Sequence, residues 1–239
     1  MDVIRHYHEI KRNTDTVFEK IDITDGAREA LVTSHNYLLD YDVLKMAISM
    51  RPEVAVLEAA VKEYQFAIFA LALGQYRHAF IGLRLFFELM LATVYFSAHE
   101  IDYRMWAKDS KDINWNALKD NQNGIFSVNF IKAFNPSFAD NGKQYLAIAE
   151  ALYRECSEYV HGNAGTHAIL PSDIAFNNEA FFSWHQKATT MRMVILFAFS
   201  SRYINYIAED AMEKMEPVIV DLFGHLRPVQ ELFSKPLGS

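Results

Sequence analysis

The stretch AFIGLRLFFELMLATVYFS, from Ala79 to Ser97, decides the fold class. Its apolar residues lie on nearly every side of a helix, and it is almost long enough to span a bilayer. However, Arg84 and Glu88 stand near its middle, where each charge would be costly in hydrocarbon. Their i,i+4 spacing lets them pair on one helix face. We therefore expect the central, buried helix of a soluble protein, with no membrane span.

Outward from this stretch, the pattern remains helical almost throughout. Apolar residues recur at helical spacing over residues 25–50, 52–74, 76–99, 143–161 and 179–215. Pro217 is expected to end the last of these helices, because a proline lacks the backbone N–H that a helix interior uses. The sequence therefore predicts an all-α fold, a helical bundle of four to five long helices.

Two polar stretches separate the long helices. The Asn- and Asp-rich residues 102–142 predict one or two short helices joined by turns. Residues 162–178 are expected to form an ordered loop that ends on a capping asparagine, Asn177 or Asn178. Neither stretch has the composition of a linker, and no repeat or low-complexity run is present, so we expect a single domain over residues 1–239.

Composition and charge indicate where the protein is located and which nucleic-acid partners it does not bind. Of the 239 residues 51% are hydrophobic and 22% charged, the balance of an ordinary soluble protein. The N-terminus lacks the apolar core of a signal peptide, and a single cysteine, Cys156, excludes an internal disulfide framework. Both features predict a cytoplasmic protein. The net charge of −7 argues against broad, sequence-independent binding to long duplexes, which needs a surplus of cations.

The stretch LYRECSEYVHGNAG, residues 152–165, contains the strongest candidate site. Arg154 and His161 are separated by about 700° of helical rotation, so they share one stripe, with a rise of roughly 10.5 Å between them. That spacing suits two groups that hold successive parts of one extended ligand. Alternatively, a two-fold axis could bring Arg154 of one subunit toward His161 of its partner.

The same residues also fit a purely structural interpretation. A histidine in the last turn meets the negative end of the helix dipole, and Gly162 is typical of the position that follows a helix. Glu150 and Glu158 flank Arg154 at i−4 and i+4, so the arginine could belong to an ordinary lattice of ion pairs. Local features alone leave both interpretations open.

The stretch resembles the signature of the HEPN superfamily, which comprises small all-α domains common in bacterial toxin and antiviral systems. That signature is an arginine, four to six intervening residues, and a histidine near a helix end. The segment R-ECSEYV-H has six, and its YVHG ending is similar to many members. The earlier helix RHAFIGLRLFFELML, with Arg84 and Glu88 in an R-x-x-x-E pattern, extends the resemblance to about residues 64–165.

The resemblance implies metal-independent RNA cleavage at the interface of two HEPN-like domains, with a role as toxin or effector in antiphage defence. His161 would transfer protons and Arg154 would stabilise charge on the phosphate. Four residues would support this pair: Arg84, Glu88, Glu155 and Ser157. Glu155 departs from the pattern, because active members often have Asn, Asp or His there, and a longer acidic side chain would repel a phosphate.

The partners that follow are RNA as substrate, a second copy in a homodimer, and a neutralising or regulatory protein. No cofactor and no metal are expected, because no second cluster with ligand spacing supports a site around His161. Cys156 lies about 140° around the helix from His161, so the two do not form a nucleophile and base pair. The alternative functions are a non-catalytic HEPN-like subunit that binds a partner protein or nucleotide, and a plain helical scaffold.

Overall fold

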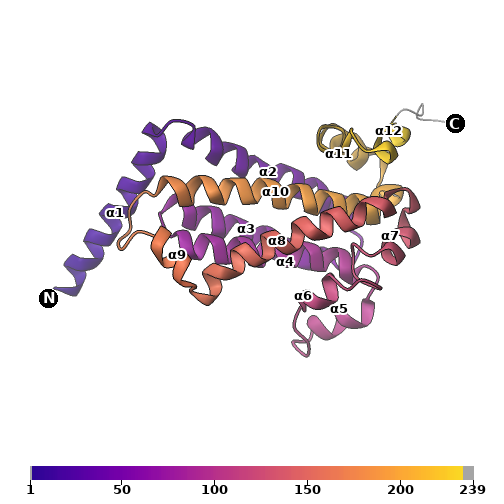
Figure 1. Cartoon of the computed structure of the whole chain (residues 1–239), viewed down its shortest axis with the longest axis horizontal. Coiled ribbons are helices and arrows are strands. Elements are labelled where there is room, and N and C mark those ends of the chain that lie inside the picture. The colour runs from indigo at the N-terminus through magenta and orange to yellow at the C-terminus, as the bar shows by residue number, and fades with distance from the viewer. Residues whose placement is uncertain (1, 234–239) are drawn as a thin grey trace. The chain divides into compact units, whose positions relative to one another are not determined.

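The computed structural model of the chain describes residues 2–233 and contains helices and no strands within that range. The helices are α1 Val3–Ile23, α2 Ala27–Ala47, α3 Val54–Ala72, α4 Tyr76–Phe96, α5 Glu100–Trp106, α6 Trp115–Leu118, α7 Val128–Phe134, η1 Pro136–Asn141, α8 Gly142–His161, α9 Ala164–Ile169, α10 Asn178–Tyr203, η2 Ile204–Tyr206, α11 Glu209–Phe223 and α12 Arg227–Phe233 (Figure 1). The predicted all-α fold is confirmed. Six helices, α1 to α4, α8 and α10, are the long ones, against the four or five expected.

The expected loop after α8 contains a short helix instead. α9 lies between α8 and α10 along the chain, as Figure 1 shows. Thr166 closes its first turn, because its amide donates to the Asn163 carbonyl at 3.0 Å and its hydroxyl to the same oxygen at 2.7 Å. The capping asparagine is Asn177, whose side-chain oxygen accepts from the Ala180 amide at 2.8 Å.

The predicted helix over residues 179–215 was wrong at its C-terminal end. The chain leaves α10 at Tyr203, passes through η2 and begins α11 at Glu209. Pro217 lies inside α11 and does not end it. Its position on the exposed side explains why it is tolerated, since the displaced backbone groups there can bond to water. Side-chain contacts of Arg202 and Tyr203 hold the end of α10. Such contacts cannot be predicted from local periodicity.

The chain divides into two compact units. The first unit comprises the chain up to Leu38, Ala59–Phe87 and Glu150–Met191. The second unit comprises Leu39–Glu58, Glu88–Ala149 and the chain from Arg192. Each unit has its own buried aromatic core.

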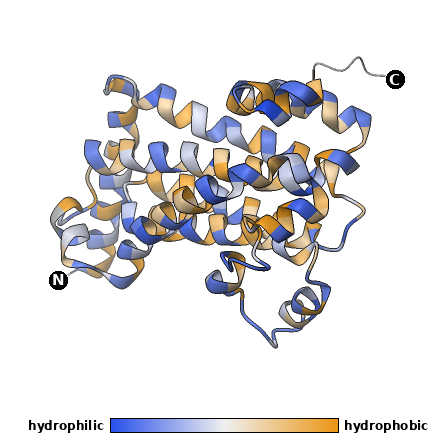
Figure 2. Ribbon diagram, turned by 45° about the vertical axis from the view of Figure 1, so that its right-hand side comes forward, coloured by the Kyte–Doolittle hydropathy of each residue, from blue (hydrophilic) through white to orange (hydrophobic). Residues whose placement is uncertain are grey.

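In the first unit the core is built around Trp184, which is fully buried. Its indole N–H donates to the Ala79 carbonyl at 3.0 Å, which satisfies the polar atom of an otherwise apolar side chain. The Tyr64 ring lies 4.7 Å from Phe86 and 5.9 Å from Trp184, measured between centroids. Figure 2 shows hydrophobic and hydrophilic residues on different sides of the same helices, the pattern that lets one face be buried.

α4 was expected to be a buried central helix, and it is. Among residues 2–233 it is the one helix long and apolar enough to cross a membrane, yet 72% of its most apolar stretch is buried inside the protein. Glu88, which belongs to the second unit, is 9% exposed. A soluble protein's core helix has these properties, so the chain is compatible with being soluble.

A buried serine and histidine pair lies in the core of the first unit. The Ser34 hydroxyl and Nδ1 of His185 are 2.7 Å apart, and both residues are at most 5% exposed. Nε2 of His185 has no hydrogen-bond partner among the described residues. Burial lowers the pKa of His185 from 6.5 to about 4, so the imidazole is neutral at physiological pH.

We predict that His185 makes the stability of the protein depend on pH. Between pH 6.5 and about 4 the unfolded histidine binds a proton that the folded one does not, so stability falls with pH by up to about 1.4 kcal/mol per unit. In His185→Gln this contribution is absent. The difference in unfolding free energy between wild type and variant, from urea titrations, should therefore shrink as the pH is lowered. Parallel pH curves would contradict the prediction, and the exposed His35→Gln is the control.

In the second unit the apolar core centres on Tyr145, whose ring stacks on Phe197 at 3.7 Å between centroids. Phe138 and Phe223 approach the same Phe197 ring at 5.9 and 6.2 Å. These side chains come from η1, α8, α10 and α11, so the aromatic stack joins four helices of this unit. Residues 100–141 form four short helices, α5 to α7 and η1, where one or two were predicted over residues 102–142.

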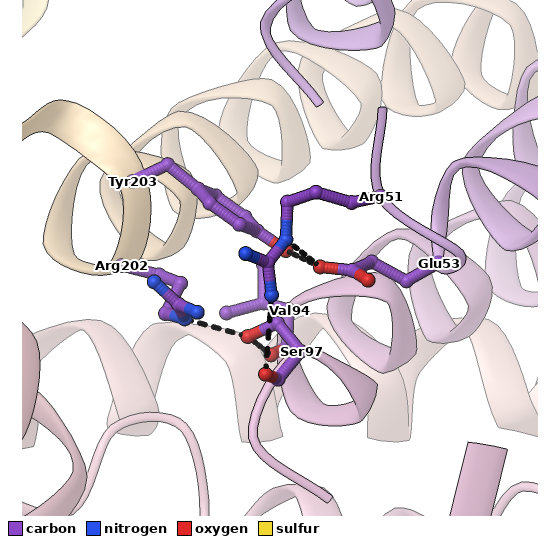
Figure 3. Close-up of polar contacts among 6 residues, drawn as sticks. All are labelled: Arg51, Glu53, Val94, Ser97, Arg202 and Tyr203. Carbon is purple, nitrogen blue, oxygen red and sulfur yellow. Dashed lines mark hydrogen bonds and ion pairs between the residues drawn. The ribbon is translucent and has the colours of Figure 1, made fainter. Parts of the chain in front are cut away.

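A buried polar cluster accompanies this apolar core (Figure 3). Glu53, 1% exposed, accepts from Arg51 Nε at 2.5 Å and from the Tyr203 hydroxyl at 2.9 Å. Arg202 Nε donates to the Ser97 hydroxyl at 2.7 Å, and its guanidinium lies 3.9 Å from the centroid of the Phe134 ring. Burial lowers the pKa of Arg202 and raises that of Tyr203. The cluster fixes the end of α10 by side-chain contacts.

We predict that Glu53→Gln destabilises the protein by about 2 kcal/mol, because the substitution leaves Arg51 without its buried carboxylate. The measurement is the free energy of unfolding in urea. The matched control is Glu100→Gln, which removes an exposed i,i+4 pair with Arg104 and should cost about 0.5 kcal/mol or less. Equal losses in the two variants would show that the buried cluster does not stabilise the fold.

Candidate functional site

The C-terminal end of α8 has the geometry that the sequence predicted. Gly162 follows the helix with a φ of 64°, a left-handed conformation that favours glycine. The Asn163 amide donates to the Glu158 carbonyl at 3.2 Å, which satisfies one of the last helical carbonyls. His161 is therefore the last residue of the helix and stands where the chain turns away from it.

Arg154 and His161 are both exposed on α8. Among residues 2–233, neither side chain forms a hydrogen bond or ion pair, so Arg154 does not take part in the ion-pair lattice with Glu150 and Glu158 that was one of the two interpretations of the sequence. We use the term α8 ridge for the stripe of Arg154, Ser157 and His161. Two residues of the ridge thus present a guanidinium and an imidazole to solvent, within the first unit.

Arg84 supports the α8 ridge from α4. Its Nε donates to the Ser157 hydroxyl at 3.0 Å, its Nη2 donates to the Tyr153 hydroxyl, and its guanidinium lies 4.4 Å from the centroid of the Tyr153 ring. The Ser157 hydroxyl in turn donates to the Tyr153 carbonyl at 2.6 Å. Sequence reasoning selected Arg84 and Ser157 but missed Tyr153, whose aromatic face and hydroxyl both hold the arginine.

Glu155 is neutralised by a lysine of α10. Nζ of Lys187 lies 2.5 Å from Oε2 of Glu155, and the lysine side chain is 17% exposed. A carboxylate paired in this way repels a nearby phosphate less than a free one does. This pair could not be predicted from local sequence patterns, because the two residues are 32 positions apart.

A second arginine, Arg77 of α4, binds the end of α8. Its Nη1 donates to the Tyr159 carbonyl at 2.8 Å, and its Nη2 lies 3.4 Å from each ring nitrogen of His167. A cation at the carbonyl end of a helix is favourable, because it meets the negative end of the dipole. Sequence reasoning missed Arg77, since the contact joins residues 82 positions apart.

The other candidates considered from the sequence are structural. Cys156 is fully buried, and burial raises the pKa of its thiol to about 12, so it is protonated at neutral pH and is not a nucleophile. Within residues 2–233 no three His, Cys, Asp or Glu residues are arranged to hold a metal ion.

Compared with known protein families, with curated proteins and with solved structures, the chain matches none. The resemblance to HEPN domains therefore remains a prediction from the residues of the α8 ridge.

We predict that Arg84→Lys destabilises the protein by about 1 kcal/mol. A lysine cannot both donate to Ser157 and lie flat against Tyr153, because its charge is a single point on a flexible stem. The measurement is the free energy of unfolding in urea. Arg28→Lys is the control in the same unit, because the ion pair of Arg28 with Asp22, at 3.9 Å, is exposed. A loss for Arg84→Lys no larger than for the control would rule out this supporting role.

Proposed function

We propose that the chain is a HEPN-like, metal-independent endoribonuclease that acts in the cytoplasm as a toxin or effector of antiphage defence. The observation that carries the proposal is the exposure of Arg154 and His161 on one stripe at a helix end. Two contacts add support: Arg84 holds Ser157 between them, and Lys187 neutralises Glu155 beside Arg154.

The residues of the α8 ridge suit cleavage by the RNA's own 2′-hydroxyl. In that reaction the 2′-oxygen forms a bond to the adjacent phosphorus while the bond from phosphorus to the 5′-oxygen breaks, which gives a cyclic phosphate and a free 5′-hydroxyl. An imidazole can take the proton from the 2′-hydroxyl or give one to the leaving oxygen. A guanidinium can stabilise the charge that develops on the phosphoryl oxygens.

The spacing along α8 favours a site shared by two subunits. Arg154 and His161 of one chain are about 10.5 Å apart along the helix axis, too far to act on one phosphate together. In a homodimer with a two-fold axis, Arg154 of one protomer would meet His161 of its partner, and two such sites would form. Val160 beside His161 is 40% exposed and offers an apolar contact for a partner.

We predict that Arg154→Ala and His161→Ala each lower RNA cleavage by about a hundredfold or more, because each removes a group that acts on the transition state. Both residues are exposed, so the melting temperature should stay within about 2 °C of wild type. The measurement is cleavage of a mixed-sequence RNA in the presence of a metal chelator. Arg104→Ala and His225→Ala are matched controls that should leave any cleavage unchanged.

Mixing the two inactive variants tests the shared site. Random exchange gives about half mixed dimers, each with one intact site, so about a quarter of wild-type activity should return. Folded single variants that cleave as fast as wild type would refute the proposal. Wild-type protein that copurifies with another protein or binds RNA without cleaving it would instead favour the non-catalytic subunit, with the α8 ridge as a binding surface.

A further inference from the structure

The first half of α1, next to the N-terminus in Figure 1, presents an exposed apolar stripe. Residues spaced alternately four and three apart place it on one side of the helix: Val3, Tyr7, Ile10, Thr14, Val17 and Ile21. Val17 and Ile21 are buried in the core of the first unit, whereas Val3 and Tyr7 are 60% and 64% exposed. One continuous stripe is thus half covered and half open. We call the open half, Val3, Tyr7 and Ile10, the α1 stripe.

The charged side chains beside the α1 stripe point to another side of the helix and bind one another. Oε1 of Glu9 lies 3.3 Å from Arg5 Nε and 4.0 Å from Arg12 Nη2. These i,i+4 and i,i+3 pairs are exposed, so none of the three charges has to be buried when the stripe is covered. The first half of α1 is therefore an amphipathic helix of the kind that docks in an apolar groove.

An apolar groove lies between α2 and α3 in the same unit. Its volume is about 470 Å³, and its lining residues, which define the α2–α3 groove, are Leu31, Val32, His35, Leu38, Gln65, Ile68, Phe69 and Ala72. None of these eight is Asp, Glu, Lys or Arg. Ile68 and Ala72 are buried, whereas Val32 and Phe69 are 51% and 62% exposed. The groove therefore has an apolar floor and an apolar rim that is open to solvent.

The α1 stripe fits the α2–α3 groove in length and in chemistry. The stripe, the α2 wall and the α3 wall each extend from position i to i+7, which is two helical turns with a rise of roughly 10.5 Å. The Tyr7 ring supplies a large apolar side chain for the groove. Its hydroxyl can bond to His35 or Gln65, the two polar residues of the lining.

The stripe and the groove do not meet within one chain. On α1, residues His6, Glu9, Ile10 and Asn13 line a different pocket, together with the start of α4 and the segment after α9. That pocket shares no lining residue with the α2–α3 groove. Because α1 is one continuous helix with its second half anchored in the core, its first half cannot turn back onto α2. The groove must therefore take the helix of another molecule.

The area to be covered indicates reciprocal exchange between two copies. A stable interface between proteins buries about 1,200 Å² or more in total. One contact of two helical turns falls short of this area. Exchange in both directions doubles it and encloses two Tyr7 and two Phe69 rings, each of which buries roughly 150–250 Å². A two-fold pair also covers both surfaces of both chains, so no open stripe remains to add further copies.

We infer that two copies of the chain associate by exchanging α1, so that the α1 stripe of each lies in the α2–α3 groove of the other. The inference goes beyond RNA cleavage and does not rest on it, because no residue of the α8 ridge belongs to the stripe or the groove. It assigns the partner of this apolar surface as a second copy of the same chain.

Sedimentation velocity of the full chain over a range of concentrations tests the exchange. Tyr7→Glu and Phe69→Glu should each weaken the wild-type dimer by about a hundredfold or more, because each dimer would bury two unpaired carboxylates. Glutamate is a good helix former and both sites are exposed, so the circular dichroism spectrum should not change. His8→Glu and Phe66→Glu are the matched controls. They are exposed on the same two helices, outside the stripe and the groove, and should dimerise as wild type does.

Single cysteines identify which surfaces meet. Val3→Cys places a thiol on the α1 stripe, Val32→Cys places one on the groove rim, and the native Cys156 is fully buried. A short bifunctional thiol reagent should give covalent dimers when the two variants are mixed, since about half of the dimers then contain both. Each variant alone should give few, because its two thiols lie at different contacts.

The inference is overturned if wild type is monomeric at about 100 μM, well above the dissociation constant of a stable dimer. It is also overturned if Tyr7→Glu and Phe69→Glu dimerise as tightly as their controls, or if either cysteine variant alone forms covalent dimers as readily as the mixture. Monomeric wild type that binds vesicles of anionic phospholipid, with binding lost in Tyr7→Glu, would assign the α1 stripe to a membrane surface instead.

The two proposals fail separately. Arg154→Ala and His161→Ala should retain the exchange, because neither residue belongs to the stripe or the groove. Dimers that persist in Tyr7→Glu and Phe69→Glu and still share active sites would overturn the exchange and leave the proposed cleavage standing. Dimers that require Tyr7 and Phe69 but cleave no RNA would do the reverse.

Discussion

The contact between α4 and α8 in the first unit is the constraint on which the α8 ridge depends. Three side chains on one face of α4, at i, i+3 and i+7, each meet α8. Arg77 binds the Tyr159 carbonyl, Phe80 stacks on the Tyr159 ring at 3.9 Å, and Arg84 binds Ser157. The apolar ring is thus flanked by two arginines whose charges are satisfied at the edge of the core. Burial of α4 and placement of the α8 ridge therefore result from the same contact.

The packing of α4 on α8 leaves a guanidinium and an imidazole exposed on α8 and places Arg77 at the C-terminal end of the helix. On the outer face, Arg154 and His161 are exposed, and within residues 2–233 neither side chain forms a hydrogen bond or ion pair. At the helix end, Arg77 contacts both the Tyr159 carbonyl and the His167 ring. A guanidinium that is already positioned by a carbonyl loses little conformational entropy when it binds an anion, because its rotamer is fixed beforehand. Such a residue suits a binding site better than a flexible surface arginine.

The sequence interpretation succeeded where the signal was local and failed where contacts between distant residues decide the outcome. The apolar pattern of α4 and the left-handed turn at Gly162 were both predicted, because helical periodicity and glycine's backbone freedom act over a few residues. The helix expected to continue to residue 215 ends instead at Tyr203, where Arg202 and Tyr203 bind Ser97 and Glu53. No pattern within residues 179–215 encodes those partners.

By itself the sequence determined that the chain is helical and that Arg154 and His161 share one stripe at a helix end. Only the tertiary structure decided that Lys187 neutralises Glu155 and that Arg77 meets His167, residues separated by 32 and 90 positions. The physical reason is that helical periodicity fixes which side of a helix a residue occupies, whereas its charge partner is set by which helix packs against that side. Electrostatics at a site in an all-α protein therefore follow from helix packing.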